Sequence, residues 1–184
     1  MSGKKILMLY GSPRRDGVTA RMAQAFEQAL PDADIRRVYL YDVRPKPCYA
    51  CGYCSTHRGC VQRDLDELYE ALEQADVICA AVPVYHLAPP APFKALLDRL
   101  QWYYDARFTA GDPVPVREKP LVLLSASGRT GDRAPQWLLP QLTYGFSLVG
   151  ATVAAHIHVG GTDGDCADTL AAALEQIKEI ANKC

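Results

Sequence analysis

The sequence predicts a doubly wound α/β fold, in which a five-stranded parallel sheet lies between two layers of helices. The main observation is an alternation of five short apolar runs with amphipathic segments of helical period. The runs at 76–82 and 121–125 are almost continuously apolar, which is typical of strands buried on both faces. Right-handed crossovers leave few topologies, and we expect the strand order 2-1-3-4-5 within one domain spanning residues 1–184.

The individual elements follow from hydrophobic period and from start and stop residues. The expected strands cover residues 5–10, 35–41, 76–82, 121–125 and 152–159. The expected helices cover residues 18–30, 65–74, 92–104, 135–149 and 165–182. Asp64 is the expected N-cap of the second helix, Pro140 is expected to kink the fourth, and the Pro- and Gly-rich residues 105–120 are expected to form a surface excursion.

The composition is that of an ordinary globular protein. Of 184 residues, 49% are hydrophobic and 22% charged, and the formal net charge of −1 gives no support for nucleic acid or an anionic membrane as a partner. No apolar run is long enough for a signal peptide or a membrane span, so we expect a cytoplasmic protein. Four of the seven cysteines lie between positions 48 and 60, which in a reducing compartment indicates metal or redox chemistry rather than structural disulfides.

The segment 11–19 joins the first strand to the first helix and has the composition of an anion-binding loop. Two glycines, the hydroxyls of Ser12 and Thr19 and the N–H groups of a helix start can surround an anion, and two arginines add positive charge. A Walker loop is excluded because Gly17 is followed by valine, and the G-x-G-x-x-G fingerprint is missing from the sequence. A monophosphate is therefore the favoured ligand, and an ordinary strand-to-helix turn is the alternative.

Two further loops follow the third and fourth strands. The loop at 82–90 is rich in proline, valine and tyrosine, whereas the loop at 125–132 is small and polar. In a doubly wound sheet, ligands bind beyond the carboxyl ends of the strands, where the winding reverses. The sequence therefore predicts one binding site built from the ends of the first, third and fourth strands.

These segments resemble the flavodoxin-like, NAD(P)H-dependent FMN reductase family. Residues 11–19 are similar to its phosphate loop G-S-P-R-x-x-G-N-T, except that Val18 replaces asparagine, and residues 83–99 are similar to its P-V-Y and K-A-L-x-D-R segments. The resemblance implies that the chain binds FMN in a flavodoxin-like fold. It implies that the phosphate is held by Ser12, Arg14, Val18 and Thr19, that the isoalloxazine is contacted by Pro83, Val84, Tyr85 and His86, and that its pyrimidine edge is met by Ser125, Ser127 and Gly128.

The clustered cysteines follow the pattern Cys48-x2-Cys51-x2-Cys54-x5-Cys60 inside a cysteine-rich loop at 44–63. Thiolates at this spacing can surround one metal centre, and the C-x2-C-x2-C run matches the way ferredoxins hold a [4Fe–4S] cluster. Two alternatives stay open, namely free thiols or adventitious disulfides, and zinc, which usually takes C-x2-C pairs that are farther apart. The pattern also resembles the motif of the iron–sulfur flavoprotein branch of the family, which implies a [4Fe–4S] cluster.

Other chemistry-bearing residues are interpreted as structural. His156 and His158 alternate on the last strand and share one face, but without an evident third ligand we expect solvent-facing or interface residues rather than a metal site. Cys79 is expected to be a buried thiol and His57 a surface residue. The aromatic run 102–104 fits either a subunit contact or core packing.

The sequence supports two functions above others. The first is an FMN-dependent oxidoreductase that takes a hydride from NAD(P)H and passes electrons to an unidentified small-molecule or protein acceptor, with no obligatory acid–base residue. The second is an electron carrier that relays single electrons between FMN, a [4Fe–4S] cluster and protein partners, and a flavin-binding redox sensor is the third. By analogy with FMN-binding relatives, we expect a homodimer or homotetramer.

Overall fold

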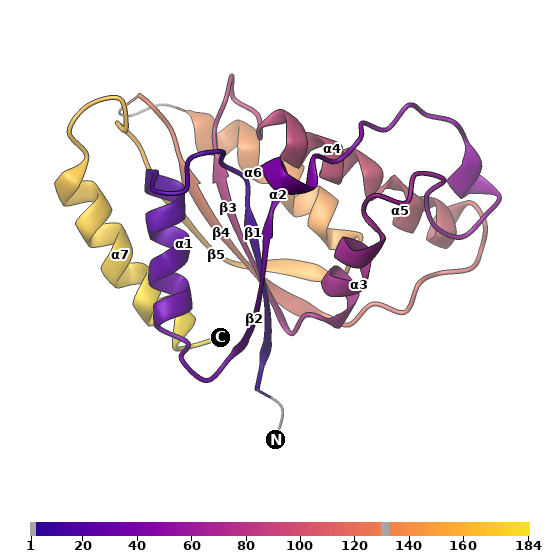
Figure 1. The fold of residues 1–184 in the computed structure, drawn as a ribbon, viewed down its shortest axis with the longest axis horizontal. Helices are drawn as coiled ribbons and strands as arrows, with labels where there is room; N and C mark the ends of the chain where they lie inside the picture. Colours follow the sequence, from indigo (N-terminus) through magenta and orange to yellow (C-terminus); the bar gives the residue numbers. More distant parts are fainter. Residues whose placement is uncertain (1–2, 130–132) are drawn as a thin grey trace.

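The computed structural model describes residues 3–129 and 133–184, which form a doubly wound α/β fold around a parallel sheet (Figure 1). The strand order is β2-β1-β3-β4-β5, and every neighbouring pair is parallel. The predicted fold class and strand order are therefore confirmed. The strands are β1 (Lys5–Tyr10), β2 (Asp34–Tyr39), β3 (Val77–Pro83), β4 (Lys119–Ala126) and β5 (Ala151–Val159).

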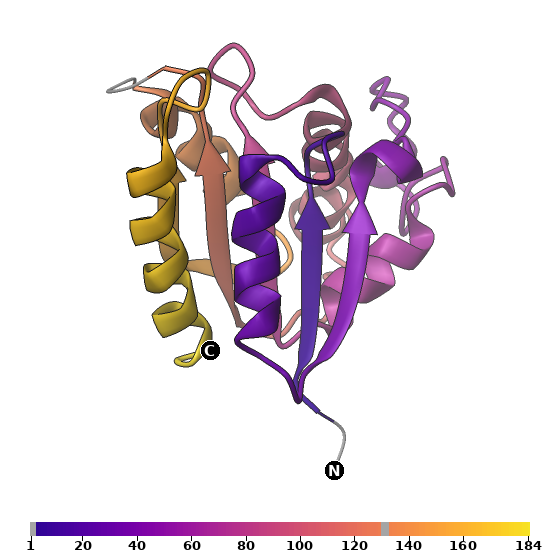
Figure 2. The same ribbon diagram turned by 60° about the vertical axis from the view of Figure 1, so that its left-hand side comes forward.

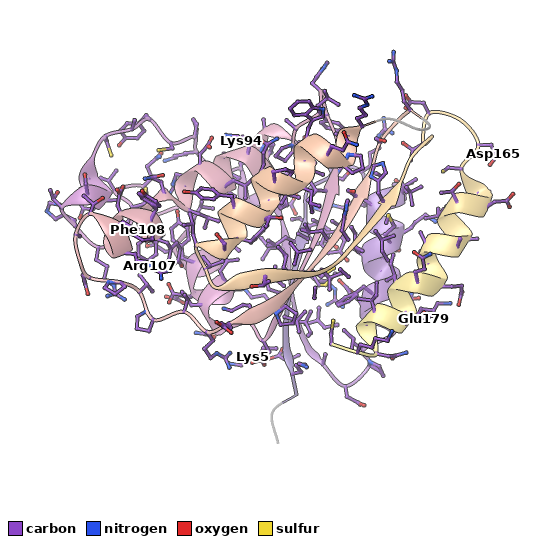
Figure 3. All side chains as sticks on the ribbon, turned by 180° about the vertical axis from the view of Figure 1, so that it is seen from behind. Lys5, Lys94, Arg107, Phe108, Asp165 and Glu179 are labelled. Atoms are coloured by element: carbon purple, nitrogen blue, oxygen red, sulfur yellow. The ribbon has the colours of Figure 1, made fainter. Side chains whose placement is uncertain are left out.

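Helices cover both faces of the sheet (Figures 1 and 2). Helices α1 (Val18–Gln28) and α7 (Ala167–Ala181) pack together on one face. The other face carries α3 (Asp66–Gln74), α4 (Ala91–Arg99) and α6 (Ala134–Ser147), with α5 (Gln101–Phe108), the short α2 (Leu40–Val43) and the 3-10 turn η1 (Tyr53–Ser55) beside them. Seen from behind, Phe108 at the end of α5 and Asp165 before α7 lie at opposite sides of the molecule (Figure 3). In the described part of the chain, no helix combines the length and the apolar composition needed to cross a membrane.

The central strand β3 shows how the sequence pattern produces the three layers. Its residues from Val77 to Val82 are at most 1% exposed, because alternate side chains enter two different cores. Ile78 packs with the cluster beneath α3, α4 and α6, whereas Cys79 packs with the cluster beneath α1 and α7. Burial raises the pKa of the Cys79 thiol well above its ordinary value, and the prediction of a buried core thiol is confirmed.

Most element boundaries differ from the predicted ones by one to three residues, and three differences are larger or have a clear structural basis. The second strand ends at Tyr39, where the chain turns into α2. The helix predicted over residues 92–104 is two helices with a break at Leu100, and the second helix continues to Phe108, into the predicted surface excursion 105–120. Asp64 does not cap α3, because its carboxylate instead pairs with the Arg99 guanidinium at 2.9 Å, and Leu65 stands at the N-cap.

The buried and exposed side chains settle the remaining structural expectations. Trp102 and Tyr103 are 6% and 3% exposed, so core packing is the correct alternative for these two aromatic residues. His57 is on the surface, as expected, whereas α6 continues through Pro140 as one helix and is not split there.

Candidate functional site

A cleft of about 510 Å³ opens at the carboxyl ends of β1, β3 and β4. It lies where the winding of the sheet reverses, which is the position at which doubly wound folds bind ligands. The structure brings all the residues predicted to contact FMN to the walls of this cleft, with the exception of Ser125. Three loops that are distant in the sequence therefore meet at one site.

The loop after β1 is held against β3 by close backbone contact. The Gly11 N–H donates to the Ala81 carbonyl at 2.8 Å, and a Cβ at Gly11 would stand only 2.8 Å from the Phe93 ring. Glycine is needed here because any side chain would push the loop away from the sheet. The loop is also tightened by the Arg14 N–H, which donates to the Ser12 hydroxyl at 3.1 Å.

Helix α1 presents its N-terminus to the cleft. It begins at Val18 behind Gly17, and no side chain caps it, so the first-turn N–H groups of Val18 and Thr19 have no partner within the helix. Such N–H groups and the positive end of the helix dipole attract an anion. Arg14 is exposed at the same wall, so this side of the cleft has the chemistry of a phosphate site.

The loop after β3 forms a narrow turn beside the cleft. Tyr85 and Ala88 exchange two backbone hydrogen bonds of 2.9 and 3.0 Å, and His86 and Leu87 between them have φ of 50° and 64°. Positive φ is unfavourable for residues with a side chain, so this turn is strained and is held by its surroundings. The Val84 N–H, which donates to the Ala126 carbonyl at 2.8 Å, ties the loop to β4.

The third wall combines the end of β4 with the segment after β5. A Cβ at Gly128 would stand 2.2 Å from an Asp163 carboxylate oxygen, so glycine allows the two segments to touch. The Thr162 N–H donates to the Ser127 carbonyl at 3.0 Å. Sequence reasoning missed Thr162 and Asp163, although the Gly-Gly-Thr-Asp run after the last strand was an available signal. Residues 130–132 of the predicted loop lie outside the described residues.

Ser125 lies one step behind the cleft. Its hydroxyl is 2.8 Å from His156 Nε2 and 2.8 Å from His158 Nδ1, and His158 Nε2 is 3.1 Å from the Ser127 hydroxyl. Both histidines are half-buried rather than solvent-facing, because they pack over β4. Burial, together with the neighbouring His158, lowers the pKa of His156 below its ordinary value.

The cysteine-rich loop is closed at its neck by Arg99 of α4. This guanidinium, whose side chain is 0% exposed, donates to the Asp64 carboxylate at 2.9 Å, to the Gln62 carbonyl at 2.6 Å and to the Lys46 carbonyl at 3.2 Å. The Lys46 N–H also donates to Asp64, at 2.9 Å. Burial pushes the pKa of Asp64 upward, but this hydrogen bond and Arg99 bring it below its ordinary value. One buried ion pair therefore joins both ends of the loop.

The four cysteines of that loop line a second cavity of about 460 Å³. Cys48 and Cys51 are exposed, Cys54 and Cys60 are half-buried, and all four are free thiols. Burial and a 3.0 Å hydrogen bond to Asp105 raise the pKa of the Cys54 thiol to about 12. Among residues 3–129 and 133–184, no three His, Cys, Asp or Glu side chains stand close enough to hold a metal ion. The donor set suits an iron–sulfur cluster, but in this arrangement the thiols do not converge on one centre.

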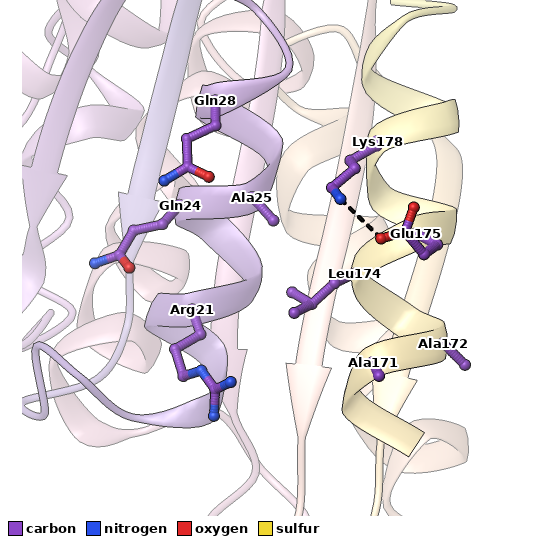
Figure 4. A pocket seen from close by; sticks show the side chains of 9 residues that line it. All are labelled: Arg21, Gln24, Ala25, Gln28, Ala171, Ala172, Leu174, Glu175 and Lys178. Carbon is purple, nitrogen blue, oxygen red and sulfur yellow. Dashed lines mark hydrogen bonds and ion pairs between the residues drawn. The ribbon is translucent and has the colours of Figure 1, made fainter. Parts of the chain in front are cut away.

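A groove of about 580 Å³ between α1 and α7 is a less favourable candidate (Figure 4). Leu174 and Ala25 face each other across it, and Lys178 pairs with Glu175 at 2.7 Å along one wall. It lies on the helical layer, where no loop contributes backbone groups, and it resembles an ordinary gap between two packed helices.

The fold and the site together define a flavodoxin-like protein whose cleft has an uncapped helix start after β1 on one side and the loop after β3 on another. The family model for NADPH-dependent FMN reductase matches residues 4–160, and the chain belongs to that family. The expected family is thereby confirmed.

Individual relatives agree with this assignment. An iron–sulfur flavoprotein of Archaeoglobus fulgidus is 33% identical over 102 residues, which are 54% of this chain and 46% of the relative. The chain thus matches about half the length of such relatives. An FMN-dependent NADH:quinone oxidoreductase of Opitutus terrae is 31% identical over 141 residues, which are 68% of this chain and 66% of the relative. An azoreductase structure from Bacillus anthracis superposes with a TM-score of 0.77 at 19% identity, over 98% of this chain and 100% of the azoreductase, and it supports the fold alone.

Proposed function

We propose that the chain binds FMN in the cleft at the ends of β1, β3 and β4, accepts a hydride from NAD(P)H there, and passes the electrons to a small-molecule or protein acceptor. The observation that carries the proposal is the convergence of three loops on one cleft of about 510 Å³, with an uncapped helix start at one end and apolar residues at the other. FMN combines a charged phosphate with a flat, largely apolar ring, and the two ends of the cleft match these two parts.

The phosphate end is assigned to Ser12, Arg14, Val18 and Thr19. The N–H groups of the first turn of α1 supply fixed donors, and Arg14 supplies a mobile charge. The loss of the asparagine side chain at Val18 costs one donor, but its backbone N–H still lies in the uncapped first turn.

The ring end is assigned to residues 83–86, with Ser127 and Gly128 at the pyrimidine edge. Pro83 and Val84 are half-buried, whereas Tyr85 is 42% exposed and borders the opening of the cleft. When bound, FMN supplies the hydride acceptor, and these residues orient it and restrict water around it. No side chain of the chain is assigned as an acid or base in the hydride step.

FMN titration of the flavin-free chain tests this placement. Arg14→Ala should weaken FMN binding about tenfold or more, because a hydrogen bond to a charged group contributes about 1.5–3 kcal/mol. Arg107→Ala is the matched control, since Arg107 is equally exposed but lies at the end of α5, far from the cleft (Figure 3). Equal affinities of the two variants, or no stoichiometric FMN binding by the unmodified chain, would reject the site.

An iron–sulfur electron carrier is the second candidate function. It is favoured by four cysteines that line one cavity within a loop closed by Arg99, and by the names of several relatives. A [4Fe–4S] cluster would be held by Cys48, Cys51, Cys54 and Cys60 after their side chains turn inward. Protein purified without oxygen should then contain about four iron atoms and matching acid-labile sulfide per chain. Cys51→Ser should lose them and Cys166→Ser should keep them, whereas iron-free wild-type protein would exclude the cluster.

We also infer a homodimer or homotetramer. Trp137 and Tyr144 on α6 are 59% and 62% exposed, and large exposed aromatic side chains favour protein contacts. Light scattering on the eluted protein tests this inference, and a monomer at all concentrations would contradict it.

A further inference from the structure

A chain of hydrogen bonds runs from strand β5 across β4 to the wall of the FMN cleft. It consists of His156 Nε2, the Ser125 hydroxyl, both ring nitrogens of His158 and the Ser127 hydroxyl, joined at 2.8, 2.8 and 3.1 Å. Ser127 is a wall residue of the cleft, whereas His156 lies at the other end on the edge strand. Four polar side chains thus connect the site with another part of the sheet.

The contact between Ser127 and Arg129 favours one direction of donation along these groups. The Ser127 hydroxyl is 3.4 Å from the Arg129 carbonyl, which can only accept, so Ser127 donates to it. In that arrangement Ser127 accepts from the Nε2–H of His158, and His158 Nδ1 accepts from the Ser125 hydroxyl.

The far end of the chain of hydrogen bonds is at His156. Since the Ser125 hydroxyl hydrogen is used toward His158, Ser125 accepts from the Nε2–H of His156. Every hydrogen bond therefore points toward the cleft. This is the arrangement in which one proton entering at His156 can release a different proton at Ser127.

The surroundings keep the middle of the chain dry and favour the neutral form of His156. Ser125 and Ser127 are 1% and 4% exposed, so bulk water does not compete for their hydroxyls. Burial, with the neighbouring His158, lowers the pKa of His156, and a neutral ring can accept and donate at the same time.

We propose that His156, Ser125, His158 and Ser127 form a proton relay that serves the FMN cleft, with the Ser127 hydroxyl as its terminal group. The proposal rests on the proposed function. Bound FMN would take a hydride from NAD(P)H and gain one negative charge, and one proton would complete the balance to the neutral reduced flavin and NAD(P)+. The relay supplies that proton, which moves from His156 to Ser125, from Ser125 to His158, from His158 to Ser127, and from Ser127 into the cleft.

The weak terminal hydrogen bond makes the last transfer accessible. At 3.4 Å, the bond between Ser127 and the Arg129 carbonyl is near the limit for a hydroxyl donor, so the hydrogen is loosely held. Rotation about the Cβ–Oγ bond is enough to turn it toward the cleft, and no backbone movement is required. We therefore assign Ser127 as the residue that contacts the bound ligand, and Ser125 and His158 as residues that act through it.

Simultaneous recording of flavin absorbance and proton uptake tests the relay. FMN-loaded protein is mixed with NADPH in weakly buffered solution near pH 6 that contains a pH indicator. In the wild type, proton uptake should keep pace with flavin bleaching. In Ser125→Ala and Ser125→Val, the rate of proton uptake should be about tenfold or more below the rate of flavin bleaching. This factor is a modest share of the rate enhancement that general acid catalysis contributes. The valine fills the space that a replacement water would need.

The controls separate a relay from a merely structural role. Cys79→Ala also deletes one buried atom from a neighbouring strand, but on the opposite face of the sheet, and its uptake should stay within about twofold of wild type. Nitrogen-detected NMR of the flavin-free protein gives a second readout. His156 and His158 should both carry the proton on Nε2, with slow exchange that becomes fast in Ser125→Ala.

Each outcome decides the proposal. Uptake that keeps pace with bleaching in both Ser125 variants, or no proton uptake by the wild type, would overturn the relay while leaving the FMN reductase function intact. If FMN is not bound or not reduced at all, the proposed function fails by itself. In that case the NMR decides, because an Nδ1–H tautomer at either histidine, or fast exchange in the wild type, would overturn the directed chain.

Discussion

Replacing Asp64 by alanine should destabilise the protein far more than replacing Asp98 by alanine, although each carboxylate makes an ion pair. Asp64 is 20% exposed and faces the fully buried Arg99, whereas Asp98 and Lys94 are 45% and 46% exposed. Removing one partner of a buried pair leaves an uncompensated charge and costs about 3–5 kcal/mol. The exposed pair one turn apart on α4 contributes only about 0.3–0.5 kcal/mol.

Thermal and urea unfolding of the two variants measure this difference. For a chain of this size, about 3–5 kcal/mol lowers the melting temperature by about 6–20 °C, whereas Asp98→Ala should lower it by less than about 2 °C. Because the loop neck depends on this pair, Asp64→Ala should also expose the cysteine loop to protease before the rest of the chain unfolds.

The pH dependence gives the same prediction an independent check. The pKa of Asp64 is lowered in the folded state. Its contribution to the free energy of unfolding is therefore present above about pH 4 and is lost as the pH falls through the folded-state pKa. The stability difference between wild type and Asp64→Ala should therefore narrow in acid. The reasoning is refuted if both alanine variants lose equal stability at pH 7, or if the difference is unchanged at about pH 2.

Three further predictions concern the cleft and its surroundings. Burial lowers the pKa of His156 in the folded state, so the unfolded state binds a proton at this histidine more readily. As the pH falls from about 7.5 to 5.5, the wild type should therefore lose stability relative to His156→Gln, which urea unfolding measures. Gly128→Ala would put a Cβ 2.2 Å from the Asp163 carboxylate and should weaken FMN binding about tenfold in a fluorescence titration, with recovery when Asp163→Ala is added. Replacing His86-Leu87 by Asn-Gly relieves two positive φ angles, of 50° and 64°, and should raise the free energy of unfolding by about 1 kcal/mol.

Each of these has an outcome that contradicts it. A pH-independent difference between wild type and His156→Gln would mean that the ring titrates alike in both states. Unchanged FMN affinity in Gly128→Ala would remove the third loop from the site. A destabilised Asn-Gly variant would show that the His86 and Leu87 side chains contribute more than their backbone strain costs.

Apolar runs predicted the sheet well, because a strand that is buried on both faces can carry few residue types other than apolar ones. The run around Cys79 was typical of a strand buried on both faces, and handed crossovers left only a few strand orders, among them the one observed. The ends of individual helices were less predictable from the sequence. No sequence pattern separates α4 from α5 at Leu100. Asp64 is a residue type that often caps helices, but here its carboxylate pairs with Arg99 on another helix.

The site was predictable where residues close in sequence share one loop. The segments 11–19 and 82–90 fulfil this condition, and both reach the cleft. Ser125 follows strand alternation instead, which turns it away from the cleft and toward the two histidines. The pairing of Ser125 with His158 depends on the register between β4 and β5 and on the irregularity near Leu121, which no single-strand pattern contains.

The spacing of the cysteines also predicted only part of the structure of their loop. It placed Cys48, Cys51, Cys54 and Cys60 around one cavity, but it did not reveal that Arg99 closes the loop or that Asp105 accepts from Cys54. Those contacts join segments that are far apart in the sequence, so they are specified by packing and not by local pattern.

Anaerobic reduction of the FMN-loaded chain by a nicotinamide tests the central claim most directly. FMN is added to flavin-free protein until binding is stoichiometric, and the flavin absorbance is followed after one equivalent of NADPH and, separately, of NADH. An FMN-dependent oxidoreductase should bleach the bound flavin with at least one of the two donors. Bound FMN that stays oxidised with both donors would contradict the account.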